Sequence, residues 1–138
     1  MPLPDTRQML PQPHTILEQL ESGLLLPREH MATLDHNEFL DRRDADREFE
    51  QQWLCCRELI EAGWWKQEPT HDSEFLVDAI RDASFMTISE ATGHHEIAAY
   101  VSDDFDLISR GSILLLNDDF LKSLWLTYTH HRIPPDCH

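Results

Sequence analysis

Glycine is scarce in this chain, with only 4 among 138 residues. β-Hairpins depend on tight turns that are rich in glycine, and on apolar and polar residues that alternate with a period of two. No segment shows sustained alternation between such turns. These two absences disfavour an antiparallel sheet and favour helices.

Cysteine is also scarce, and the three cysteines are Cys55, Cys56 and Cys137. An odd count with two adjacent members does not build a disulfide framework. The longest apolar runs, such as residues 113–116, are far shorter than the roughly 20 residues of a membrane-spanning helix. The first residues lack the basic and apolar regions of a secretory signal. We therefore expect reduced thiols, no membrane partner and a cytoplasmic location.

Positive charge is the third deficit. The chain has 11 Lys and Arg against 26 Asp and Glu, for a formal net charge of −15. Such a chain is repelled by phosphate backbones and anionic membranes, and it attracts cationic surfaces. Residues 68–138 hold 13 acids and 4 bases and are the more unbalanced half. The charge argues against nucleic acid and for a basic protein partner.

Apolar residues recur at helical steps through most of the chain. The clearest example is 44–62, where Ala45, Phe49, Trp53, Cys56 and Ile60 are three or four residues apart. Prolines predict an extended N-terminal arm over 1–13, followed by one helical domain over 14–138. The predicted fold is an all-α bundle of five or six helices. An α+β variant, with a small strand near 64–67 or 113–116, stays open.

Helix ends are predicted from capping residues and glycines. Thr15 and Glu18 have the spacing of a capping box, Asp35 or Asn37 can cap a short helix, Asp72 or Ser73 a longer one, and Asn117 the last. We expect helices to stop at Gly23, Gly63 and Gly93. The mixed charges of 41–48 predict a solvated surface.

A metal site is the tempting chemistry in a chain with 9 histidines. Glu90 and His94 are four residues apart, and His95 and Glu96 follow. However, Gly93 interrupts the helix, and adjacent histidines point about 100° apart. We expect no metal, no cofactor and no catalytic residue, and keep a metal-dependent enzyme that uses Glu90, His94, His95 and Glu96 as an alternative.

Residues 92–108, TGHHEIAAYVSDDFDLI, resemble a block found in small acidic bacterial proteins of uncharacterised role. These proteins resemble immunity proteins, the cytoplasmic inhibitors of interbacterial toxins. The likeness extends over about 75–125. It implies a protein-binding function and assigns a role to no residue.

The leading hypothesis is therefore an acidic module that docks a basic toxin or effector through one helical face. The candidate contacts are Asp103, Asp104, Asp106, Asp118 and Asp119, with Trp64 or Trp65 as the packed anchor. One of the two tryptophans is expected to pack back across the helix end. A plain solubilising surface is the alternative for the carboxylates. A regulatory or scaffold subunit that pairs with itself is the second alternative for the protein.

Overall fold

A computed structural model describes residues 10–135 of the chain. Within this range it contains seven α-helices and no strand, so the all-α fold is confirmed, whereas five or six helices was too few. The helices are α2 (Pro13–Ser22), α3 (Arg28–Met31), α4 (His36–Ala45), α5 (Arg47–Lys66), α6 (His71–Thr92), α7 (His95–Ile113) and α8 (Asp119–Thr129).

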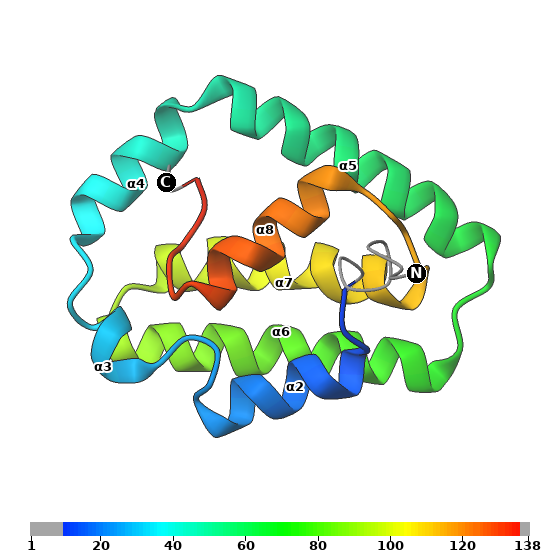
Figure 1. Cartoon of the computed structure of the whole chain (residues 1–138), viewed down its shortest axis with the longest axis horizontal. Coiled ribbons are helices and arrows are strands. Elements are labelled where there is room, and N and C mark those ends of the chain that lie inside the picture. Colours follow the sequence, from blue (N-terminus) through cyan, green and yellow to red (C-terminus); the bar gives the residue numbers. More distant parts are fainter. Residues whose placement is uncertain (1–9, 136–138) are drawn as a thin grey trace, which may run out of the picture.

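The helices α6 and α7 form an antiparallel pair at the centre of the fold (Figure 1). They are antiparallel neighbours because Gly93 ends α6 in a left-handed conformation with φ of 70°, and α7 begins two residues later. The helix α2 packs on α6, and α8 lies against α7. The long helix α5 arches over this assembly and contacts α7 and α8 (Figure 1).

The core is centred on α7, which is buried on most of its surface. Ile97, Val101, Phe105 and Ile108 are inaccessible to solvent or nearly so. The ring of Phe105 lies 4.7 Å from that of Tyr128 on α8. Full burial of one large apolar side chain contributes about 1.5–3 kcal/mol, so this helix fixes the positions of its neighbours.

Several helix ends differ from their predictions. The stops at Gly23 and Gly93 and the cap at Asp35 are confirmed. The capping box is wrong, because α2 begins at Pro13 and no side chain caps it. Thr70, rather than Asp72 or Ser73, caps α6, and Asp118, rather than Asn117, caps α8.

Gly63 does not end its helix. The helix α5 continues to Lys66, because Trp64 is buried against the core and draws a further turn onto it. An added Cβ at Gly63 would lie 3.3 Å from Cδ1 of Leu114, so this glycine serves close packing instead. The strand alternatives at 64–67 and 113–116 are wrong as well, since the first is helical and the second is a helix end and turn.

The predicted arm over 1–13 lies mostly outside the described residues. In its described part, Leu10 packs against the core, and the carbonyl of Pro11 accepts a 2.5 Å hydrogen bond from Oγ of Ser112. The boundary at residue 14 stays a prediction. Among residues 10–135, no helix is both long and apolar enough to cross a membrane.

Candidate functional site

Asp104 was expected near an exposed face, and the structure places it in the core instead. Its carboxylate accepts hydrogen bonds of 2.7 and 2.9 Å from Arg43, 2.9 Å from Nε1 of Trp53 and 2.5 Å from the hydroxyl of Tyr128. The side chain has no exposed surface. Asp104 therefore joins helices and does not face a partner.

Arg43 was expected on a solvated surface and is also buried. Its guanidinium lies 4.8 Å from the ring centres of both Phe49 and Tyr100, and it donates a 3.0 Å hydrogen bond to the carbonyl of Pro134. Burial alone would lower the pKa of Arg43, but the adjacent Asp104 carboxylate outweighs this and raises it. Arg43 and Asp104 thus form a charged and fully hydrogen-bonded pair.

Asp106 is mostly buried at the edge of the surface. It accepts hydrogen bonds of 2.6 and 3.1 Å from Arg110, which also donates one of 2.9 Å to Glu61 on α5. These hydrogen bonds lower the pKa of Glu61. Arg110 therefore ties α5 to α7 and leaves the Asp106 carboxylate largely neutralised.

Of the three aspartates of α7, Asp103 is the most exposed to solvent. It lies 3.8 Å from Arg81 on α6. Partial burial raises its pKa, and the neighbouring Asp104 and Asp106 raise it further, while Arg81 opposes them. The surroundings of Asp103 therefore disfavour its ionised form.

Beside Asp103, α6 carries a row of carboxylates that the sequence analysis missed. Glu74, Asp78 and Asp82 are spaced by four residues, so they lie on one side of the helix. All three are exposed, and none has an ion-pair partner within the described residues. We call Glu74, Asp78, Asp82 and Asp103 the acidic face. Its signal in the sequence was the spacing of four.

Two hollows follow the acidic face. One of about 230 Å³ lies between the end of α5 and α6, where Trp65, Glu74 and Asp78 line it. The other, of about 440 Å³, is lined by Asp78, Asp82 and Ser102. The two share Asp78 and Arg81, so they are neighbours along α6.

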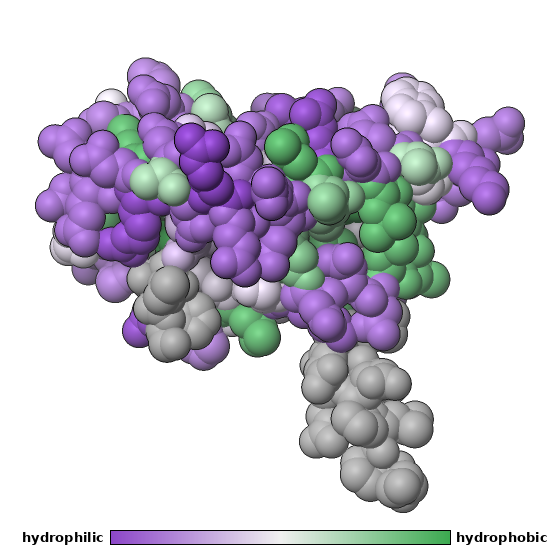
Figure 2. Space-filling model, turned by 90° about the horizontal axis from the view of Figure 1, so that it is seen from above, coloured by the Kyte–Doolittle hydropathy of each residue, from purple (hydrophilic) through white to green (hydrophobic). Residues whose placement is uncertain are grey.

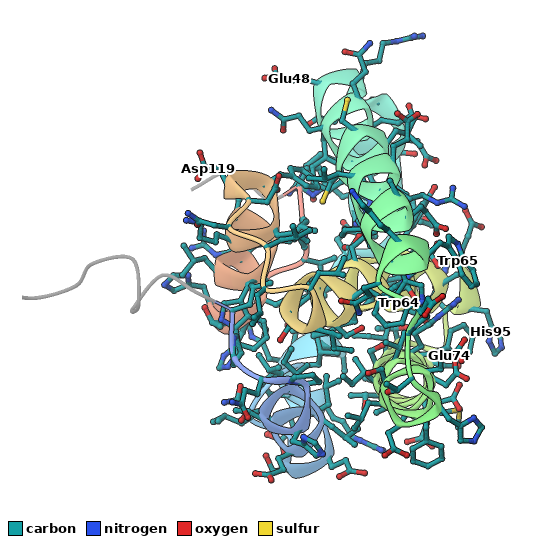
Figure 3. All side chains as sticks on the ribbon, turned by 90° about the vertical axis from the view of Figure 1, so that its right-hand side faces the viewer. Glu48, Trp64, Trp65, Glu74, His95 and Asp119 are labelled. Carbon is teal, nitrogen blue, oxygen red and sulfur yellow. The ribbon has the colours of Figure 1, made fainter. Side chains whose placement is uncertain are left out.

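The two tryptophans behave as predicted for such a pair. Trp64 is buried and stacks under Arg110, whose guanidinium carbon is 5.7 Å from the ring. Trp65 is 65% exposed, and its indole nitrogen donates a 3.3 Å hydrogen bond to Glu61. Figure 3 shows Trp65 on the same side of the molecule as Glu74. An exposed aromatic ring therefore stands at one end of the acidic face.

Asp118 and Asp119 lie elsewhere. They line a groove between α5 and α8, and Figure 3 shows Asp119 on the opposite side of α5 from Trp65. Oδ1 of Asp118 accepts a 3.0 Å hydrogen bond from the amide of Leu121 and so caps α8. The five predicted carboxylates therefore do not form one surface.

The residues of the alternative metal cluster point to different partners. Glu90 pairs with Arg28, the ring of His94 lies 4.7 Å from that of His36, and His95 contacts Oγ of Ser89 at 3.3 Å. Glu96 is exposed in the first turn of α7. Within residues 10–135, no three His, Cys, Asp or Glu side chains come together in a way that could hold a metal ion. The structure thus offers no observation in favour of the metal-dependent alternative.

Comparison with known proteins gives one match. A family model described as immunity protein PIM1 matches residues 15–135, which is most of the chain. No curated protein and no solved structure matches.

Proposed function

This chain belongs to the immunity protein PIM1 family, and on that premise we propose that it neutralises its toxin by binding a cationic surface through the acidic face. Membership in an immunity family implies a toxin as the binding partner. We infer in addition that the toxin presents a basic surface, and the charge of the acidic face supports this inference.

The observation that carries the proposal is the exposed row on α6. Like charges four residues apart destabilise a helix by about 0.2–0.5 kcal/mol per pair. Glu74, Asp78 and Asp82 make two such pairs, and none of the three forms an ion pair with a Lys or Arg among the described residues. A cationic partner would remove this repulsion, whereas a surface needed only for solubility gains nothing from aligning the charges.

Asp103 supports the same conclusion. Its raised pKa reports that its carboxylate is less well stabilised by its surroundings than in water. A Lys or Arg of the partner placed beside Asp103 would supply the missing stabilisation. The binding energy would then include relief of a cost already present in the free protein.

Aromatic side chains flank the carboxylates. Trp65 is exposed at one end of the face, and Phe75 is exposed on the first turns of α6. Tryptophan and other aromatic residues often carry most of the energy at protein interfaces, while charged residues around them set the encounter rate. The acidic face therefore combines attraction with a packing anchor.

The test is a charge-removal variant, Glu74→Gln with Asp78→Asn and Asp82→Asn, measured against the toxin that the wild-type chain neutralises. We expect association to slow by about ten-fold or more at low salt, because steering accounts for two or more decades of rate in charged complexes. The rate is measured by stopped-flow mixing.

The matched control is Glu18→Gln with Glu21→Gln and Glu29→Gln. These residues are exposed on α2 and α3, and the variant changes the net charge by the same amount. Equal slowing in both variants would show that net charge, and not the acidic face, steers the toxin, and would overturn the proposal.

A further inference from the structure

A groove between α5 and α8 lies apart from the acidic face. Its volume is about 990 Å³. The walls are Phe49, Cys55 and Leu59 on α5 and Phe120 and Leu124 on α8, and Pro134 is at one end. Figure 1 shows how α5 and α8, the helices that carry most of these residues, are placed in the fold. We call this the α5–α8 groove.

Several apolar side chains in the groove are exposed to solvent or only half-buried. Leu59 is 49% exposed and Cys55 is exposed, while Phe49 and Phe120 are half-buried with their rings 5.4 Å apart. Figure 2, which views the molecule from the side of α5, shows hydrophobic residues on a surface that is mainly hydrophilic. Leu59 and Cys55 therefore present apolar surface to solvent beside the two rings.

The charges in the groove have one sign. Asp118 and Asp119 line it, and no Lys or Arg does. Asp119 is fully exposed, and its one described partner is Lys122, at 3.8 Å. The occupant that fits this lining has apolar side chains and at least one cationic side chain.

The walls of the groove also favour one type of backbone. Both are helices, and no strand edge is present in the described part of the chain to which an extended peptide could add. Amphipathic helices bind apolar grooves of this kind through residues spaced by three or four.

We propose that the α5–α8 groove receives an amphipathic helix of the toxin, with its apolar side chains between α5 and α8 and a Lys or Arg beside Asp118 and Asp119. The proposal rests on the proposed function in one respect, namely that the partner is a toxin. It adds a second contact, on the other side of α5 from Trp65.

Cys55 provides a probe inside the groove, because it is exposed, whereas burial raises the pKa of its neighbour Cys56 to about 12 and keeps that thiol unreactive. In a Cys137→Ser background, iodoacetamide should alkylate Cys55 in the free protein. We expect alkylation of Cys55 to be about ten-fold slower, or slower still, when the protein is saturated with its toxin. A ten-fold change corresponds to about 1.4 kcal/mol.

Two outcomes of this experiment would overturn the groove proposal. An unchanged alkylation rate in the saturated toxin complex would show that the groove stays open. Protection that appears without toxin, and grows with protein concentration, would show that a second copy of the chain fills it.

A pair of variants separates the groove from the acidic face. Leu59→Glu places a charge among the apolar walls and is expected to weaken toxin affinity by about ten-fold or more, or about 1.4 kcal/mol. Leu24→Glu is the matched control, since Leu24 is 62% exposed and lies outside the groove. If Leu59→Glu weakens binding and the α6 charge variant does not, the acidic face fails and the groove stands. The reverse result overturns the groove alone.

Hydrogen exchange on the toxin tests the nature of the occupant. The segment that loses protection when Leu59→Glu replaces the wild-type chain should be helical, apolar on one side and basic at one end. A protected segment that is extended or acidic would overturn the assignment.

Discussion

Asp104 is the residue on which the arrangement of four helices depends. Its carboxylate contacts Arg43 of α4, Trp53 of α5 and Tyr128 of α8 from its own position on α7. Burial, followed by the Asp104 charge, raises the pKa of Tyr128 well above its ordinary value, so its hydroxyl stays protonated and donates. One buried anion is thus satisfied by three donors.

We expect Asp104→Asn to destabilise the fold by about 3–5 kcal/mol, because it leaves the buried guanidinium of Arg43 without a counter-charge. Urea unfolding followed by circular dichroism measures the change. Tyr128→Phe, which removes one donor and no charge, should cost about 1–3 kcal/mol. A loss below that of Tyr128→Phe would contradict this account of Asp104.

Asp103 allows a pH-dependent prediction with a defined sign. Its pKa in the folded protein is raised, so between its ordinary value of 3.8 and the raised value the folded state binds more protons than the unfolded state. The stability of the wild-type protein therefore falls as the pH rises through this window, and Asp103→Asn removes that fall. The variant should be more stable relative to wild type at neutral pH than near pH 4, as urea unfolding at both would show. The opposite trend would show that Arg81 dominates.

Sequence patterns identify residue environments when the cause is local. They correctly divided Trp64 and Trp65 into one buried and one exposed ring. They did not find Arg43 and Asp104, since the two are 61 positions apart and each stands in a run of charges that resembles a solvated surface. An ion pair between residues this far apart in the chain leaves no periodic pattern in the sequence.

At the scale of elements, α7 and α8 approach closely at Gly111. A Cβ there would lie 2.5 Å from Cδ1 of Leu121, closer than packed atoms tolerate. A side chain at position 111 would therefore force the buried Leu121 side chain to shift.

We expect Gly111→Ala to destabilise the protein by about 1–3 kcal/mol through overpacking. The clash is with the Leu121 side chain, so its removal should relieve it. In a double-mutant cycle with Leu121→Ala, the summed cost should exceed that of the double variant by more than about 0.5 kcal/mol. Additive costs would mean that the two sites do not touch.

Helix existence followed from periodicity, while helix ends did not always follow from capping residues. Periodicity predicted α5, α6 and α7 because each buries a stripe. Gly63 was misread as a stop because the sequence does not show that Trp64 has a core to pack against. Thr70 caps α6 before the two residues proposed, because several neighbouring polar side chains are each chemically competent to cap.

At the scale of the whole molecule, the exposed carboxylates form two groups that lie on different sides of α5. The acidic face lies along α6 and α7, and Asp118 and Asp119 lie in the α5–α8 groove. Composition predicted a surplus of carboxylates, but only the fold shows that these two groups of exposed carboxylates lie on separate surfaces.

We expect association with the toxin to slow as salt rises, because the Debye length falls from about 30 Å at 0.01 M to about 3 Å at 1 M. Dissociation should change much less, since packed contacts of Trp65 and the groove are not screened. Surface plasmon resonance across this salt range measures both rates. An association rate that ignores salt would argue against the acidic face as the site of encounter.

The hydrogen bond from Arg43 to the carbonyl of Pro134 bears on how the chain acquires its structure during synthesis. The carboxylate that neutralises Arg43 belongs to Asp104, 61 positions later, and the carbonyl that accepts its further hydrogen bond belongs to Pro134, 91 positions later. A nascent chain that has emerged only through α5 holds this guanidinium without its counter-charge. The first helices therefore acquire the contacts that hold Arg43 only after residues 104 and 134 have been synthesised.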